Sequence, residues 1–189
     1  MTLNVGHEKS MKLSRIALCA AILTAGCRSV EHSVSANSTD ESASVATAVL
    51  QYEIMCYEKE WAATALPQGQ KAGVYFLSVD YDHSPNKDIS RSDFSDPNRR
   101  ILDCFAGLTP PVKPVSLSTF AANGTAIDKK TGTLGRLFCV SHVSIASPED
   151  AMVSGGYHVG GLYAAGFTYH LKKSHGRWIV VERKQEWVS

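Results

Sequence analysis

The residues best suited to chemistry are three histidines in the C-terminal third of the chain: His142, His158 and His170. Each lies in a different segment with the residue pattern of a strand, and three imidazoles on one face of a sheet could bind zinc or transfer protons. A slip of one residue in strand pairing reverses the face, so the register across Gly160-Gly161 decides whether His158 and His170 share one. Neither HxH nor HExxH spacing is present, and partly exposed sheet histidines without a metal are the alternative.

Motifs of nucleophilic and phosphate chemistry are missing from the sequence. There is no Gly-x-Ser-x-Gly elbow. Gly155-Gly156 lies inside a strand pattern and does not open a helix, as a phosphate-binding loop would. We therefore name no catalytic residue and expect no cofactor. A binding function is favoured, and the alternative is an enzyme whose pocket holds one of the histidines against Asp82, Asp103 or Glu182.

Aromatic residues gather in the same segments, and Tyr163 and Trp178 are among them. Together with the three histidines, these two residues are our candidates for the lining of a ligand groove, while core packing is the other interpretation. Phe167 and Trp178 are expected to be buried, because they lie in strand patterns rich in β-branched and aromatic residues.

Four segments in which side chains alternate with a period of two must position these residues. Short connections containing Gly, Pro or Asp separate the segments, which is typical of an antiparallel meander. The segments are residues 134–145, 151–158, 162–173 and 177–182, the last extended by Trp187-Val188.

Two helices and one more strand are expected ahead of this meander. Apolar residues at steps of three and four predict a helix over residues 44–61. Its apolar stripe comprises Val45, Ala48, Val49, Tyr52, Met55 and Cys56. Asp96-Pro97 is a typical helix start, and residues 74–79 are expected to form a buried strand. The sequence thus predicts an α+β domain in which two N-terminal helices pack on a curved antiparallel sheet.

This order of elements looks like the cystatin-like and nuclear-transport-factor-like cone folds, in which a curved sheet wraps a helix. Glycines in the predicted strands and turns would permit such curvature. The chain also resembles small bacterial envelope proteins of no assigned chemistry, over most of residues 74–189. The stretches that carry this likeness are Asp96-Pro97 with Arg99-Arg100, Pro110-Pro111-Val112-Lys113, Asp128-Lys-Lys-Thr-Gly132, Gly155-Gly156-Tyr157, Gly176-Arg-Trp178-Ile-Val and Trp187-Val-Ser189.

The segment Ile22-Leu23-Thr24-Ala25-Gly26-Cys27 resembles the lipobox of bacterial lipoproteins, although Thr24 stands where Leu is usual. It closes an apolar run preceded by Lys12 and Arg15, as in a secretory signal peptide. The resemblance implies cleavage before Cys27 and attachment of acyl chains such as palmitate to that residue. The protein would then be lipid-anchored in the cell envelope and face the periplasm. Arg28 replaces the Asp that favours inner-membrane retention in some lipoproteins, which favours the outer membrane.

Composition divides the chain into three parts. Residues 1–26 form the expected signal peptide, of which residues 1–10 are either a gene-start extension or a long polar leader. Residues 27–43 comprise the lipidated cysteine and a segment rich in Ser, Thr, Asn and Glu, which is expected to be a flexible tether. Residues 44–189 are expected to form a single domain.

The charge of the chain excludes one class of partner. The full sequence has a net charge of +1, and the part after the signal peptide has 16 basic and 17 acidic residues. A near-neutral surface gives no footprint for nucleic acid. The expected partners are the membrane, through the covalent lipid, and a protein or small molecule that the sequence does not identify.

Three cysteines follow Cys27: Cys56, Cys104 and Cys139. An exported chain meets oxidising conditions, so one disulfide and one free thiol are possible. Three pairings are open, and Cys56 with Cys104 is slightly favoured because both lie on predicted helical elements. Three small buried hydrophobic residues are the alternative. No CxxC spacing occurs, which argues against a structural zinc site or a thioredoxin-type centre.

Overall fold

The computed structural model describes residues 38–61, 72–81, 94–160 and 163–189. All of them belong to one unit, Val34–Ser189. The predicted signal peptide, Cys27, Asp82 and the tether up to residue 37 lie outside the described residues.

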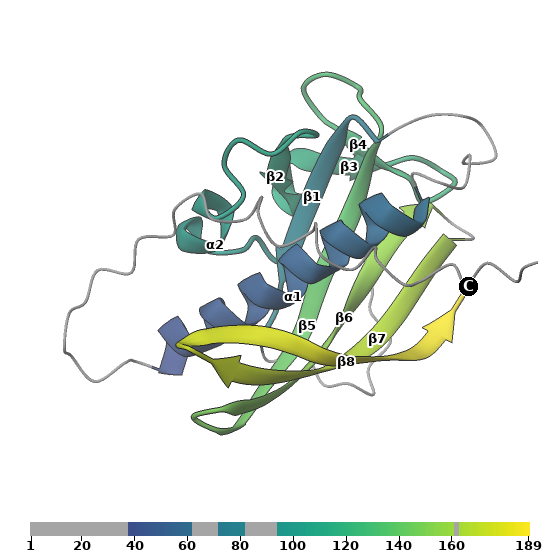
Figure 1. Cartoon of the computed structure of the whole chain (residues 1–189). Coiled ribbons are helices and arrows are strands. Elements are labelled where there is room, and N and C mark those ends of the chain that lie inside the picture. The colour runs from purple at the N-terminus through teal and green to yellow at the C-terminus, as the bar shows by residue number, and fades with distance from the viewer. Residues whose placement is uncertain (1–37, 62–71, 82–93, 161–162) are drawn as a thin grey trace, which may run out of the picture. The chain divides into compact units, whose positions relative to one another are not determined.

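A six-stranded sheet forms the body of this unit (Figure 1). Its strands are β1 (Val74–Val79), β2 (Val112–Pro114), β5 (Gly135–Ser147), β6 (Asp150–Gly160), β7 (Tyr163–Ser174) and β8 (Arg177–Val188). They lie in the order β2-β1-β5-β6-β7-β8. The predicted meander of β5 to β8 is confirmed as antiparallel, and β1 is the expected buried strand. The sheet is mixed, however, because β1 pairs parallel to both β5 and β2.

One long helix, α1 (Ser38–Trp61), crosses a face of this sheet, which we call the helix face (Figure 1). The helix begins six residues before the predicted start, so residues 38–43 are helical and not part of the tether. Acidic residues in its first turn suit the positive end of the helix dipole. The residues that α1 buries are Ala43, Val45, Ala46, Val49, Leu50, Glu53, Ile54 and Tyr57. Met55 was expected in this stripe but is 51% exposed, because Glu53 takes a core position instead.

The second predicted helix is only a short one, α2 (Arg99–Asp103), and it follows β1 in the chain. The expectation of two N-terminal helices packed on the sheet is therefore not confirmed. Its N-cap is Asn98, whose side chain accepts a hydrogen bond from the Ile101 amide at 3.0 Å. The Asp96 carboxylate, expected in that role, instead accepts the Ser116 amide at 2.7 Å.

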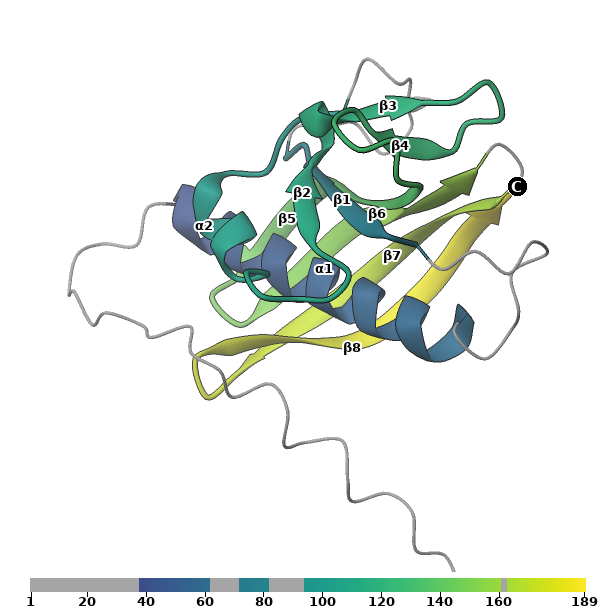
Figure 2. The ribbon, with the colours of Figure 1, turned by 90° about the horizontal axis from the view of Figure 1, so that it is seen from above.

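The opposite side of the sheet, the open face, is covered only in part by the described elements. The hairpin of β3 (Ser118–Phe120) and β4 (Ala126–Asp128), with the 3-10 helix η2 (Val115–Leu117) before it, packs over β1 and β5. Figure 2 shows this hairpin and α1 on opposite sides of those strands. The hairpin side has its own small apolar cluster, which includes Phe76, Val115 and Leu137.

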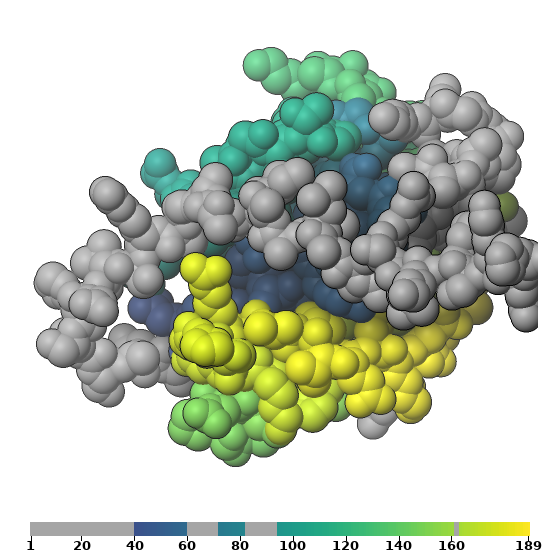
Figure 3. All heavy atoms as spheres, in the orientation of Figure 1, coloured from purple at the N-terminus to yellow at the C-terminus, as the bar shows by residue number. Residues whose placement is uncertain are grey.

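Polar contacts at the first turn of α1 connect the helix to β7 and β8 and to α2. Glu41 Oε1 accepts hydrogen bonds from Lys173 Nζ at 2.6 Å and from Trp178 Nε1 at 2.8 Å. Asp40 pairs with Arg100 of α2 at 2.5 Å. In the space-filling view, the atoms of α1 lie between the yellow atoms of β8 and the teal atoms of the α2–β2 segment (Figure 3). Neither described helix combines the length and the apolar character that a membrane span requires.

Candidate functional site

The three candidate histidines all lie on the open face. His170 is opposite Met152, and His142 is opposite Ser154 on the other side of β6. Register runs unbroken along β6 from Met152 to His158, so these alternate residues point the same way. Val153, which lies between Met152 and Ser154 and so points to the other face, belongs to the core beneath α1. The register question left open by the sequence is thus answered: His158 and His170 share a face.

Sharing a face does not bring the histidines together. His142 is on β5 and His170 is on β7, with β6 between them. Their partners on β6, Ser154 and Met152, are two residues apart, which places the two histidine backbones roughly 12 Å apart. His158 lies on β6 four residues beyond Ser154, the partner of His142, which is a distance of about 13 Å along the strand. Within the described residues, no three His, Cys, Asp or Glu side chains gather as a metal site.

His170 instead belongs to a small ion cluster at the β6–β7 edge. Its Nε2 lies 2.9 Å from Asp150 Oδ1, and Lys172 contacts the other oxygen of that carboxylate. The lysine, and then the imidazole, hold the pKa of Asp150 below its usual value. Glu182 is the cross-strand neighbour of His170 on β8. These groups join adjacent strands on the open face, and their role is to stabilise the pairing.

A row of four rings crosses the open face, and we call it the aromatic row. Trp187 of β8 lies 6.3 Å from His158, His158 lies 5.8 Å from Phe94, and Phe94 stacks on Phe120 at 6.0 Å. Trp187 pairs with Gly166, and a Cβ there would lie 2.1 Å from the indole nitrogen. The indole therefore lies directly on glycine backbone. Trp187 nevertheless stays 43% exposed.

His158 is the only member of the aromatic row that can titrate. Burial lowers the pKa of His158, so its ring is neutral at pH 7 and presents one donor and one acceptor nitrogen. Within the described part of the chain, the aromatic rings next to His158 are those of Phe94 and Trp187. The aromatic row therefore combines one exposed ring, that of Trp187, with three partly buried rings, one of which is a neutral polar group.

The two aromatic candidates differ in their surroundings. Trp178 is 8% exposed and gives its indole N–H to Glu41, with Lys173 Nζ 5.4 Å from the ring centre. It is a core residue, as is Phe167, so the expected burial of both is confirmed. Tyr163, the first residue of β7, is 47% exposed. Trp178 therefore cannot line a groove, whereas Tyr163 remains accessible.

A buried ion pair on the helix face was not predicted from the sequence. Arg183 Nε lies 2.9 Å from Glu53 Oε1, and the Glu53 side chain is 2% exposed. The guanidinium of Arg183 also lies 3.6 Å from the centre of the Phe167 ring. Burial, and then the charge of Glu53, raise the pKa of Tyr169. The sequence did contain a signal for this pair: Glu53 lies at a core position of α1, and a fully buried Glu needs a partner of opposite charge.

Among the described residues, Cys56, Cys104 and Cys139 form no disulfide, so the structure does not contain the predicted bridge between Cys56 and Cys104. Cys104 Sγ donates to the Arg100 carbonyl of its own helix at 3.3 Å, so its side chain points back along α2. Cys139 Sγ lies 3.5 Å from the Gly156 carbonyl, and burial raises the pKa of this thiol to about 12. Cys139 therefore stays protonated and is a poor nucleophile.

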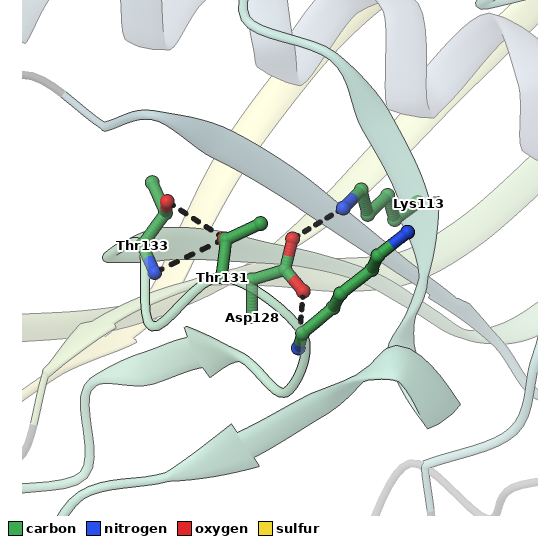
Figure 4. A network of polar contacts seen from close by, with 5 residues as sticks. Lys113, Asp128, Thr131 and Thr133 are labelled. Carbon is green, nitrogen blue, oxygen red and sulfur yellow. Dashed lines mark hydrogen bonds and ion pairs between the residues drawn. The ribbon is translucent and has the colours of Figure 1, made fainter.

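A polar network fixes the β3–β4 hairpin against the sheet (Figure 4). Asp128, at the end of β4, contacts Lys113 of β2 and accepts the Lys130 amide at 2.9 Å. Thr131 and Thr133 join their hydroxyls across the following turn at 2.8 Å. The Lys113 ammonium, and then the Lys130 amide, hold the pKa of Asp128 below its usual value. We interpret the network as structural, because its charged and polar groups serve as one another's ion-pair and hydrogen-bond partners.

This network should make stability depend on pH. A depressed folded-state pKa means that the ionised Asp128 stabilises the fold above the ordinary value of 3.8. That contribution is lost as pH falls from 3.8 through the lower folded-state value. We expect Asp128→Asn to lower the urea midpoint at pH 7, with the difference from wild type shrinking in acid. Asp103→Asn, on an exposed i,i+4 pair with Arg99, is the control and should change little. A difference that persisted undiminished in acid would contradict the charge argument.

Comparison with known proteins gave no family model, curated protein or solved structure that matches this chain.

Proposed function

We propose that this protein is a lipid-anchored component of the bacterial cell envelope, attached at Cys27 and facing the periplasm from the outer membrane. Its α+β domain binds a partner protein through the open face of the sheet. The observation that carries the binding function is Trp187, whose indole packs directly on Gly166 and which is 43% exposed. Tryptophan is the residue most enriched among the anchors of protein interfaces.

The surroundings of Trp187 support an interface more than a catalytic pocket. The aromatic row continues from it across three other segments, and Met152, 41% exposed, lies on the same face. Exposed apolar side chains with polar residues beside them are typical of a protein-binding patch. His158 places a neutral, partly buried hydrogen-bonding group beside Trp187.

The alternative, an enzyme with a His and acid pocket in the cone of the sheet, has less support. Such a pocket would lie between α1 and the sheet, whereas the three histidines lie on the open face. Among the described residues, the carboxylate that contacts a candidate histidine is Asp150 beside His170, and it forms an ion cluster with Lys172.

We also propose the finer fold assignment, a cystatin-like or nuclear-transport-factor-like cone. It is supported by the way the sheet bends around α1 (Figure 2). Register shifts at Val140/His142, Gly166/Phe167 and His170/Leu171 are the irregularities that allow strands to bend.

The anchoring is tested by Cys27→Ser. We expect this variant to accumulate as an unprocessed precursor without acyl groups, because the thiol is the attachment point. Membrane fractionation and intact mass of the wild-type and variant proteins measure the effect. Each buried methylene contributes about 0.8 kcal/mol, so several chains hold the protein on the membrane and one does not. A wild-type mass without fatty acid, together with a correctly cleaved variant, would refute the anchor.

The open-face interface is tested by crosslinking in the native envelope. A photoreactive amino acid replaces Met152 on the open face or, as a matched control, Met55, which is similarly exposed on α1. We expect a discrete adduct from position 152 and none from position 55. Adding Trp187→Ala should reduce the adduct at least fivefold, since interface anchors are worth about 2 kcal/mol or more. Equal labelling from both positions, or labelling that is indifferent to Trp187, would overturn the proposal.

A further inference from the structure

The two edges of the six-stranded sheet differ in their suitability for pairing with another strand. Among the described residues, the edge strands of this sheet are β2 and β8. β2 has three residues and ends in Pro114, which has no amide N–H to donate. β8 has twelve residues, with neither glycine nor proline among them. Alternate residues of an edge strand direct their N–H and C=O groups outward, so β8 is a long template for a further strand.

β8 is also exposed along most of its length. Ile179 and Val181 are 50% and 55% exposed, and Trp187 and Val188 are 43% and 67% exposed. In the space-filling view, the yellow atoms of β8 lie at the surface of the molecule (Figure 3). A long edge strand with exposed apolar side chains is a typical site of association between chains.

The side chains of β8 are divided between the two faces of the sheet. Those on the open face are opposite even-numbered residues of β7, the set to which His170 belongs. The open-face residues of β8 are Arg177, Ile179, Glu182, Lys184 and Trp187. Two register shifts leave Val181 and Glu186 as extra residues of β8. Such bulges disfavour an added strand, unless that strand has its own extra residues at matching positions.

A second copy of β8 meets this condition. Directly opposite residues of a sheet point to the same face, so the two-fold axis of an antiparallel self-pairing must pass through a residue. With the axis at Arg183, Glu182 is opposite Lys184 of the second copy, and Ile179 is opposite Trp187. All four of these residues lie on the open face. Each strand has one bulge between the two pairs, so the faces stay matched beyond the bulges.

The residues paired in this register are complementary. Glu182 and Lys184 are exposed residues of opposite charge, and directly opposite Cβ atoms lie about 5 Å apart, so two cross-strand ion pairs flank the axis. The exposed Ile179 and Trp187 form an apolar pair at each end. Registers centred on Glu182 or on Lys184 instead place like charges directly opposite each other, which is destabilising.

We infer that the protein forms a two-fold dimer through antiparallel pairing of β8 with β8 of a second copy, with Arg183 at the axis. Each Arg183 brings its own counter-charge to the axis, since its Nε lies 2.9 Å from Glu53 Oε1. The dimer goes beyond the proposed function, because it uses the backbone edge of β8 and not the aromatic row. The two sheets become one continuous sheet, with both open faces on the same side.

Sedimentation velocity of the full chain, purified in mild detergent, tests the dimer over a series of concentrations. We expect a reversible dimer. Glu182→Lys places two lysines opposite each other on both sides of the axis, and should weaken dimerisation about tenfold. Lys184→Glu should have a similar effect. The double variant with both exchanges restores opposite charges, so its dissociation constant should return close to that of wild type. Asp103→Lys, at an exposed site on α2, is the control and should change nothing.

Disulfide trapping tests the register. A mixture of Glu182→Cys and Lys184→Cys chains should form a disulfide-linked dimer on mild oxidation, because the two positions are directly opposite. Glu182→Cys chains alone should give far less, since the two copies of position 182 are diagonal neighbours roughly 7–8 Å apart. Urea unfolding of each charge variant shows whether it is folded, and recovery in the double variant excludes a general folding defect.

Three results would overturn the inference: a monomer at every concentration, a dimer indifferent to both single charge reversals, or equal trapping from the mixture and from Glu182→Cys alone. Trapping of a different envelope protein in place of a second copy would also overturn it. The photochemical adduct from position 152 should persist in Glu182→Lys, so the dimer and the open-face interface can fail separately.

Discussion

Trp178→Ala should destabilise the domain by about 3–5 kcal/mol, the range for removing a large aromatic side chain from a core. The indole is 8% exposed and packs in the main core beneath α1. The variant also loses the hydrogen bond to Glu41, which fastens the first turn of the helix to the β7–β8 hairpin. Because a domain is typically stable by only about 5–15 kcal/mol, the variant should be close to unfolding in mild urea.

Two matched variants separate the contributions to this loss. Trp178→Phe keeps a ring and removes the N–H donor to a charged group, which should cost about 1.5–3 kcal/mol. Trp187→Ala changes the same residue type where it is 43% exposed, and should cost less than about 1 kcal/mol. Equilibrium urea unfolding measures all three. If Trp178→Ala and Trp187→Ala were equally mild, the burial of Trp178 would be wrong.

Glu53→Ala should have an effect of similar size, about 3–5 kcal/mol, because it leaves the charge of Arg183 without its partner. The Glu53 side chain is 2% exposed and that of Arg183 is 16% exposed, so water can replace little of the lost interaction. The measurement is again equilibrium unfolding in urea. Glu186→Ala, in an exposed pair with Lys184, is the control and should cost less than about 1 kcal/mol.

The double variant Glu53→Leu with Arg183→Met tests the physical reason. Replacing both charges by apolar groups of similar size removes the desolvation cost together with the attraction, and such exchanges are often neutral or stabilising. We expect the double variant to be within about 1 kcal/mol of wild type, and thus far more stable than Glu53→Ala. A double variant as unstable as the single one would mean that Glu53 contributes chiefly through other contacts.

The helix face therefore holds two buried cations in different states. Arg183 is compensated by Glu53, which α1 places in the core at a structural cost. Arg136 is compensated by neutral groups alone within the described residues.

Local sequence determined the meander and its core. The strands from Gly135 to Val188 follow a two-residue period with short turns, and both features depend only on neighbouring residues. Burial of Trp178 and Phe167 followed from the same pattern. The strand Val74–Val79 was predictable as well, because its whole run is apolar or small.

Tertiary structure decided which side chains meet, because register and strand order depend on contacts between distant segments. The parallel pairing of β1 with β5 joins residues about 60 apart in the chain, and no local pattern reports it. The helix stripe was misjudged at Met55, since the partner that lets Glu53 enter the core lies on β8. The aromatic row is assembled from four separate segments. Arg136 has the pattern of an ordinary strand residue, and only the folded structure shows that it is buried beside Tyr57, 79 residues away.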